Sequence, residues 1–309
     1  LAALAQADSG GALAVITGIE GASYRPLGAM MALGADGRRV GSLSSGCIEA
    51  DISRHGAAMR ANDRPRKLRY GLGSPWRDIT LPCGGGLDIL LLPAPDRTLL
   101  REALARHGAR QALVLKIHAE SGALALSGQG STGWDEAWFS VRIEPEIFFY
   151  VFGKGPEAAT FAALAQAAGF SCLVLSPDDD TLVSARDAGA AVRHLVSAGL
   201  PADLAPDGRS AVVLFFHDHE WEPPILAQAL TSPAFYSGAQ GSRAARQARD
   251  SALLAAGVDK GQLARIRGPI GLVPGARDAR MLAVSVLAEV LAQAQQEDGF
   301  PVGRKATRT

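Results

Sequence analysis

Two glycine-flanked cysteines are the residues of this sequence best suited to chemistry. Cys47 follows the stretch GSLSSG, and Cys83 precedes three glycines. We expect Ser44 or Ser45 to cap a helix, with Cys47 in its first turn and Gly46 allowing the tight turn before it. In a first turn the helix dipole and unpaired N–H groups lower the pKa of a thiol. The alternative is that each cysteine is a small buried residue that fills a gap in the core.

The composition of the 309 residues limits the classes of function. Basic and acidic side chains number 31 each, so no net charge favours nucleic acid or an anionic membrane surface. No apolar run reaches the ~18 residues expected of a membrane helix. With Cys172 the cysteines number three, which is too few for a disulfide framework and predicts a reducing compartment, the cytoplasm. They also lack CxxC spacing, so we expect no structural zinc site.

The chain is long enough for two domains with full cores. Residues 1–145 are expected to form a mixed α/β domain, with buried strands at Ala12–Gly18 and Leu87–Leu92 and a last strand at Trp134–Ile143. The first of these strands ends in a loop of small residues that carries Arg25. This loop is either a plain connection or an anion-binding turn that presents the guanidinium and backbone N–H groups.

The second half, residues 146–309, alternates strands and helices. A buried strand, Ile147–Phe152, runs into the GxGxxA pattern of Gly153 and Gly155, and the acidic Asp178 follows about 20 positions later. This order of strand, glycine turn, helix and acid is typical of a Rossmann-type half. The predicted fold is therefore α/β, with an N-terminal mixed α/β domain followed by a C-terminal Rossmann-like parallel-sheet domain.

Polar loops follow the later strands of this half, where open α/β sheets keep their ligands. The histidines of one loop either ligate a metal through imidazole or simply hydrogen-bond and face water. The other loop opens a helix, where backbone N–H groups and a guanidinium can hold a phosphate. The first loop contains His217, Asp218 and His219, and the second contains Gly241, Ser242 and Arg243.

Several stretches together resemble the XdhC/CoxI family, the accessory proteins of xanthine dehydrogenase and related molybdenum hydroxylases. The resemblance spans nearly the whole chain, with little of it between residues 99 and 146, and the combination is more specific than any single motif. The stretches are EGASYRPLGAMM (Glu20–Met31), GSLSSGCIEADI (Gly41–Ile52), LPCGGGLDILLLP (Leu81–Pro93), FGKGPEA (Phe152–Ala158), FFHDHE (Phe215–Glu220), SPAFYSGAQGSR (Ser232–Arg243) and GPIGLVPGARDARMLAVSVLAEVLA (Gly268–Ala292).

The resemblance implies a chaperone and not a metabolic enzyme. Family members are understood to bind molybdenum cofactor (molybdopterin), protect it while its terminal sulfur is installed, and pass it to apo-xanthine dehydrogenase or a related molybdenum hydroxylase. A cysteine desulfurase and a second copy of the chain are the other implied partners. Thiolates can serve as soft ligands for molybdenum, so we expect both glycine-flanked cysteines on one cleft of the first domain. The expected cofactor-binding residues are Cys47, Cys83, Arg25, Ser44, Ser45, Gly46, Glu49, Gly84, Gly85, Gly153, Gly155, Asp178, His217, Asp218, His219, Gly241, Ser242 and Arg243.

An NAD(P)-dependent oxidoreductase built on the second domain is the main alternative. The GxGxxA pattern and Asp178 support it, but the sequence has no Tyr-x-x-x-Lys or comparable acid–base set for hydride transfer. Lys154 stands inside the glycine turn, and Ser176 replaces an acid that the family often has. We therefore expect weak or absent NAD binding. A scaffold whose Rossmann domain serves only dimerisation and docking is a further alternative, with the apolar helix around Met281–Leu291 as a dimer face.

Overall fold

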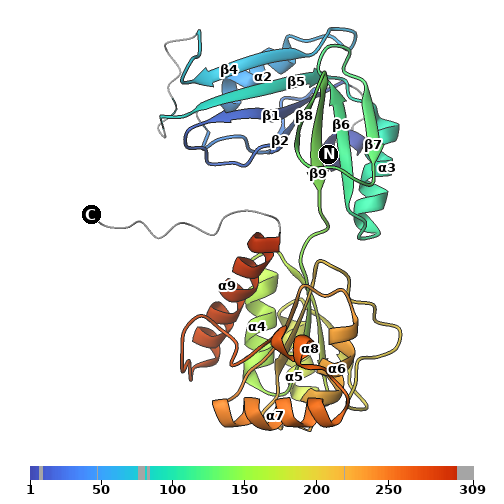
Figure 1. Cartoon of the computed structure of the whole chain (residues 1–309). Helices are drawn as coiled ribbons and strands as arrows, with labels where there is room; N and C mark the ends of the chain where they lie inside the picture. The colour runs from blue at the N-terminus through green and yellow to red at the C-terminus, as the bar shows by residue number, and fades with distance from the viewer. Residues whose placement is uncertain (7–9, 47, 76–80, 82–83, 219, 298–309) are drawn as a thin grey trace, which may run out of the picture. The chain divides into compact units, whose positions relative to one another are not determined.

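A computed structural model describes residues 1–6, 10–46, 48–75, 81, 84–218 and 220–297 of the chain (Figure 1). The chain divides into two compact units, Leu1–Pro145 (unit 1) and Glu146–Thr309 (unit 2). Within the described part of the chain, no helix combines the length and the apolar character that crossing a bilayer requires.

A five-stranded antiparallel sheet forms the first part of unit 1, in the order β3-β2-β1-β5-β4 (Figure 1). Its central strand is covered on both faces, because Leu13 and Val15 belong to one hydrophobic cluster while Ala14 and Ile16 belong to another. This two-sided burial explains the continuous apolar run of the strand. The strands are β1 (Ala12–Glu20), β2 (Met30–Leu33), β3 (Arg39–Gly41), β4 (Arg66–Gly71) and β5 (Gly86–Pro93).

Helices and a second sheet pack against the two faces of the five-stranded sheet. On one face Ile48 and Ile52, at the start of α2 (Glu49–Ala57), join the cluster of Ala14 and Ile16. The other face packs against the four-stranded sheet β7-β6-β9-β8 and against α3. The remaining elements of unit 1 are α1 (Ala2–Gln6), α3 (Arg97–Gly108), β6 (Leu113–His118), β7 (Leu124–Ser127), β8 (Gly133–Asp135) and β9 (Trp138–Ile143).

The prediction of one strand over Trp134–Ile143 is wrong, because this stretch belongs to two strands. Strands β8 and β9 pair with each other antiparallel, with Trp134 opposite Phe139. Glu136 lies between them with a φ of 50°. This left-handed backbone conformation reverses the chain and cannot continue an extended strand.

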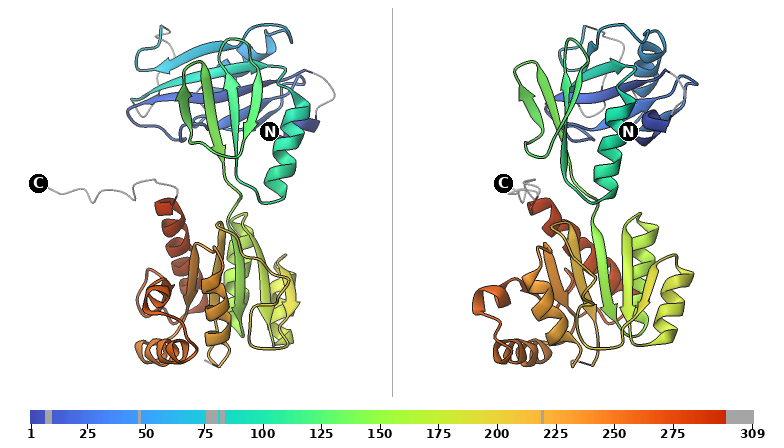
Figure 2. Two further views of the ribbon diagram at one scale, coloured as in Figure 1. Left: turned by 45° about the vertical axis from the view of Figure 1, so that its right-hand side comes forward. Right: turned by 90° about the vertical axis from the view of Figure 1, so that its right-hand side faces the viewer.

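Unit 2 is a six-stranded parallel sheet in the order β12-β11-β10-β13-β14-β15, which confirms the predicted Rossmann-like fold. Helices α4, α5 and α9 pack on one face and α6 and α7 on the other (Figure 2). The strands are β10 (Phe148–Gly153), β11 (Ser171–Ser176), β12 (Ala191–His194), β13 (Ser210–Phe215), β14 (Tyr236–Ala239) and β15 (Ile266–Arg267). The helices are α4 (Pro156–Ala167), α5 (Asp179–Asp187), α6 (Glu222–Thr231), α7 (Arg243–Ala255), α8 (Lys260–Ala264) and α9 (Ala279–Glu297).

A fully buried ion pair joins α6, α7 and the end of β14. Arg249 Nη1 lies 2.8 Å from Glu222 Oε2, and it also donates to the carbonyl oxygen of Gln240 at 3.2 Å. Both charged side chains are inaccessible to solvent. Since a buried charge without its partner is strongly unfavourable, this pair ties the two helices to the loop that follows β14.

Replacing Arg249 by Met should therefore lower the free energy of unfolding by about 3–5 kcal/mol, because Glu222 loses its buried counter-charge. The double variant Glu222→Leu/Arg249→Met removes both charges and should regain much of that loss. Arg246→Met, at an exposed position of the same helix, should cost less than about 1 kcal/mol. Urea unfolding measures all three, and a single variant as stable as the wild type would show that the pair contributes nothing.

Candidate functional site

Three motif loops leave one edge of the five-stranded sheet. Strand β1 ends at Glu20 and β3 at Gly41, while β4 ends at Gly71 and β5 begins at Gly86. Because all neighbouring strands are antiparallel, these ends lie at the same edge of the sheet. We call this the glycine-loop edge, formed by residues 21–29, 42–46, 48, 72–75, 81 and 84–85. The described residues on either side of both predicted cysteine sites belong to it.

Two of these loops pack closely enough to need glycine. The N–H of Leu72 donates to the carbonyl oxygen of Gly85 at 3.0 Å. A Cβ on Gly85 would lie 2.2 Å from the carbonyl oxygen of Ala22, and one on Gly71 would lie 2.2 Å from that of Gly85. Loops 21–29 and 72–85 are therefore in backbone contact, and larger residues at these positions would force them apart.

The guanidinium of Arg69 braces the same edge, which the sequence reasoning missed. It pairs with the carboxylates of Glu20 and, at 2.9 Å, Asp88, and its Nε donates to the carbonyl oxygen of Leu72 at 2.8 Å. Strands β1, β4 and β5 each contribute one of the three charged groups. The available signal was one acid at the start of the stretch Glu20–Met31 and another in the stretch Leu81–Pro93, either of which could pair with a cation of a neighbouring strand.

A carboxylate of the chain itself fills the loop between β3 and α2. Glu49 Oε1 accepts hydrogen bonds from the N–H groups of Leu43, at 3.2 Å, and Ser44, at 2.7 Å, and from the hydroxyl of Ser42, at 3.0 Å. Its Oε2 accepts from the N–H of Ile48 at 3.3 Å. Burial alone would raise the pKa of Glu49, but these donors outweigh it and hold the pKa below its ordinary value.

The predicted helix start in this loop is wrong. The helix begins at Glu49, Ile48 is its N-cap residue, and no side chain caps it. Ser44 and Ser45 therefore do not cap the helix, and its first turn begins at Glu49. The physical reason is that the Glu49 carboxylate accepts from the N–H of Ile48, which a capping Ser45 was expected to satisfy.

The predicted site residues of unit 1 that the structure describes fall within the glycine-loop edge or beside it. Arg25 is exposed, and its backbone is held by hydrogen bonds with the Ser23 hydroxyl. Gly84 has a φ of 69° and open space around its Cα. Cys47 and Cys83 lie outside the described residues. The others in this unit are Ser44, Ser45, Gly46, Glu49 and Gly85.

In unit 2 the glycine turn after β10 is engaged by a side chain of α5. The N–H of Gly155 donates to Thr181 Oγ1 at 2.8 Å, and this hydroxyl donates to Asp178 at 2.5 Å. Asp178 also caps α5 by accepting from the N–H of Thr181. Hydrogen bonds from Thr181 hold the pKa of Asp178 below its ordinary value. The predicted residues Gly155 and Asp178 thus lie close together. The N–H of Gly155 and the carboxylate of Asp178 both form hydrogen bonds with Thr181.

A cavity of about 590 Å³ opens at the carboxyl ends of β13, β14 and β15. We call it the carboxyl-edge cavity. Its polar wall includes His217, Gln240 and the start of α7, where Ser242 accepts from the N–H of Ala245 at 3.1 Å. Four of the predicted residues line this cavity: His217, Gly241, Ser242 and Arg243. Asp218, the neighbour of His217 in sequence, is exposed, and His219 lies outside the described residues.

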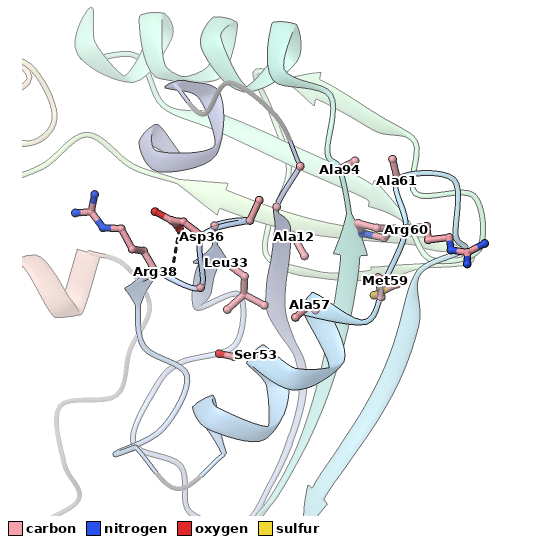
Figure 3. Close-up of a pocket in the computed structure, with 17 residues that line it drawn as sticks. Ala12, Leu33, Asp36, Arg38, Ser53, Ala57, Met59, Arg60, Ala61 and Ala94 are labelled. Carbon is pink, nitrogen blue, oxygen red and sulfur yellow. Dashed lines mark hydrogen bonds between the residues drawn. The ribbon is translucent and has the colours of Figure 1, made fainter.

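A second cavity, of about 440 Å³, lies at the opposite edge of the unit 1 sheet, away from the motif loops. Figure 3 shows it between the β2–β3 turn and the end of α2, with alanines on several sides. Arg38 points away from it, and the N–H of Arg38 donates to Asp36 Oδ1 at 3.0 Å. The cavity therefore offers little chemistry. Among the described residues, no cluster of His, Cys, Asp and Glu could hold a metal ion.

Comparisons with known proteins agree with this arrangement. The chain matches the models of the XdhC and CoxI family over residues 4–71 and of the XdhC Rossmann domain over residues 149–290. It is 35% identical to the molybdenum cofactor insertion chaperone PaoD of Escherichia coli, over 91% of this chain and 82% of PaoD. It is 26% identical to a probable xanthine dehydrogenase subunit of Bacillus subtilis, over 94% of this chain and 95% of that protein.

A solved structure shares the fold. The crystal structure of a xanthine dehydrogenase from Bacillus halodurans superposes with a TM-score of 0.76 at 24% identity, covering 99% of this chain and 96% of that one. The likeness therefore extends over both units.

Replacing Glu49 by Gln should lower the free energy of unfolding at pH 7 by about 2 kcal/mol, because three backbone N–H groups lose a charged acceptor. The folded-state pKa of Glu49 lies below its unfolded value. Its contribution is therefore present above the unfolded pKa, about 4.3, and is lost as the pH falls through the folded pKa.

Urea unfolding between pH 7 and pH 3 measures this effect, and the gap between wild type and variant should narrow toward the acidic end. Glu102→Gln is the control, since this carboxylate pairs with Arg106 on the exposed surface of α3 and should cost less than about 0.5 kcal/mol. A gap that stays constant over the whole pH range would contradict the role of Glu49.

Proposed function

Because the chain belongs to the XdhC and CoxI family, we propose that it is a molybdenum cofactor chaperone. In this role it holds the cofactor while a cysteine desulfurase supplies the terminal sulfur, and it then delivers the cofactor to a xanthine dehydrogenase-type molybdenum hydroxylase. The relationship with PaoD, over 82% of the length of that protein, carries the proposal. The convergence of the motif loops at one sheet edge supports it.

The donor set of the glycine-loop edge fits such a cofactor. Molybdenum bound by a pterin dithiolene is a soft centre, and the thiolates of Cys47 and Cys83 are soft donors that can face it. A phosphate needs a cation or free N–H groups, and the exposed guanidinium of Arg25 supplies a planar set of donors. The loop around Ser44 is less suited to the phosphate, because Glu49 already takes its N–H groups.

The carboxyl-edge cavity is the second proposed contact with the cofactor. Its volume of about 590 Å³ is in the usual range for small-molecule sites. Apolar walls from Ile270, Val273 and Leu282 face polar groups from Gln240 and Arg243. This combination suits a flat heterocycle that carries an anionic substituent.

The proposal extends to domain organisation and assembly. Residues 1–145 act as an XdhC/CoxI-type N-terminal domain and residues 146–309 as a Rossmann-like C-terminal domain. We place the protein in the cytoplasm, where the reduced cysteines fit. A homodimer through α9 is supported by Met281 and Val284, which are 52% and 58% exposed and apolar.

Replacing Cys47 or Cys83 by Ala should weaken the binding of molybdenum cofactor by at least about tenfold, while stability falls by only about 1 kcal/mol. The matched control is Cys172→Ala, a buried cysteine of the Rossmann core, which should change stability but not cofactor binding. Titration of the full chain with isolated cofactor, followed by thermal unfolding, separates the two effects. Cysteine variants that bind cofactor as the wild type does would sink the assigned role.

The protein alone should not reduce NAD with a purine or an aldehyde, because the sequence has no Tyr-x-x-x-Lys or comparable acid–base set for hydride transfer. Absorbance of NADH at its usual band, recorded with the pure chain and each substrate, measures this. Robust turnover would overturn the chaperone role in favour of an NAD(P)-dependent oxidoreductase.

A further inference from the structure

The glycine turn of unit 2 has the shape of a dinucleotide site. In Rossmann domains that bind dinucleotides, the second glycine has no side chain so that the pyrophosphate can approach the backbone at the helix N-terminus. Here this residue is Gly155, with a φ of 97°, directly before α4. Strands β10 and β13 are neighbours, so the turn lies at the switch point of the sheet, where such ligands bind.

A carboxylate of α4 already occupies the approach to this glycine. Glu157 lies in the first turn of the helix, and a Cβ placed on Gly155 would be only 3.4 Å from Glu157 Oε2. Its Oε1 lies 3.4 Å from Nε2 of His217, in the loop after β13. The carboxylate therefore sits between the two loops that border the switch point, where the helix dipole stabilises a negative charge.

This carboxylate is held close to the turn instead of extending into water. The Glu157 side chain is 18% exposed, and its Oε2 is buried without a hydrogen-bond partner. The N–H of Gly155 does not bond to it, because that N–H donates to Thr181 Oγ1. An incoming pyrophosphate would therefore find the N–H taken and a negative charge in its place.

The positive charge of Lys154, in the same turn, does not offset the repulsion between Glu157 and a pyrophosphate. Lys154 is exposed, and its charge acts on Asp178, which belongs to the same hydrogen-bonded group as Thr181. It follows the first glycine, whereas Glu157 lies against the second, the one that must admit the pyrophosphate. The carboxylate of Glu157 is thus the charge that lies against the glycine where the pyrophosphate must approach.

We propose that Glu157 is a specificity-determining residue that excludes dinucleotides from the Rossmann unit. Its carboxylate fills the place of the pyrophosphate and repels that group, while Thr181 keeps the Gly155 N–H occupied. The unit retains the fold of a dinucleotide-binding domain, but its open ligand space is the carboxyl-edge cavity, beyond β13. This assignment goes beyond the chaperone role and does not require it.

The test is titration of the full chain with NAD and NADP by calorimetry. The wild type should show no saturable binding up to about 1 mM. Glu157→Gln keeps the shape and removes the charge, and Glu157→Ala also removes the bulk. Each should increase NAD affinity by at least about tenfold, and adding Thr181→Ala should increase it further.

The matched control is Asp187→Asn, which removes one exposed carboxylate elsewhere in the same unit and should leave NAD affinity unchanged. Circular dichroism and thermal unfolding show that each variant is folded, and the isosteric Gln variant guards against misfolding of the Ala variant. Micromolar NAD binding by the wild type would overturn the proposal. So would folded Glu157 variants, including the double variant, that bind NAD no better than the wild type. Neither result bears on molybdenum cofactor, which is titrated separately.

Discussion

The antiparallel pairing of β1 with β5 is the interaction on which the arrangement of unit 1 depends. Its register places Ala12 opposite Pro93 at one end and Glu20 opposite Gly86 at the other. Since β4 pairs with the far side of β5, Gly71 also meets Gly86. A slip of one residue would exchange the two buried faces of β1 and separate the loops. The register of β1 and β5 thus determines both which side chains are buried in the core and which loops meet at the glycine-loop edge.

The charges at this edge reinforce the register. Arg69 joins acids from both neighbours of its strand, one of them at the very end of β1. Such a brace contributes modestly to stability when it is partly exposed, but it fixes where the loops begin. The loops after β1 and before β5 then meet in the backbone contact of Gly85 with Ala22.

Two of the turns with predicted cofactor-binding glycines, at Gly46 and at Gly155, have carboxylates of the chain itself beside them. In unit 1 Glu49 takes the N–H groups of its loop, and in unit 2 Glu157 lies against Gly155. Backbone N–H groups near the protein interior must be satisfied, and an internal acceptor does this without a ligand. The number of glycines therefore does not decide whether a turn binds an external anion. Acidic residues within a few positions of the turn decide whether it can bind an external anion.

Much of the fold follows from local sequence pattern. The alternation of apolar strands with helices after residue 146 predicts the parallel sheet, and the GxGxxA spacing predicts the turn after β10, since both depend on neighbours in sequence. The start of α2 and the hairpin at Glu136 were mispredicted. They depend on a carboxylate that folds back onto its own loop and on a single left-handed residue. The site was harder to predict, because Arg69 reaches Glu20 across 49 positions and Thr181 reaches Gly155 across 26. No local pattern reports such pairs, which arise only when strands and helices are packed.

The most direct measurement is the activation of a purified apo-hydroxylase of the xanthine dehydrogenase type by sulfurated molybdenum cofactor, with and without this chain. We expect the chain to raise the rate at which activity appears by at least about tenfold. Elemental analysis should show molybdenum leaving the chain as it enters the hydroxylase. Equal activation rates with and without the chain, or a chain that retains no molybdenum before transfer, would contradict the proposed role as a cofactor chaperone.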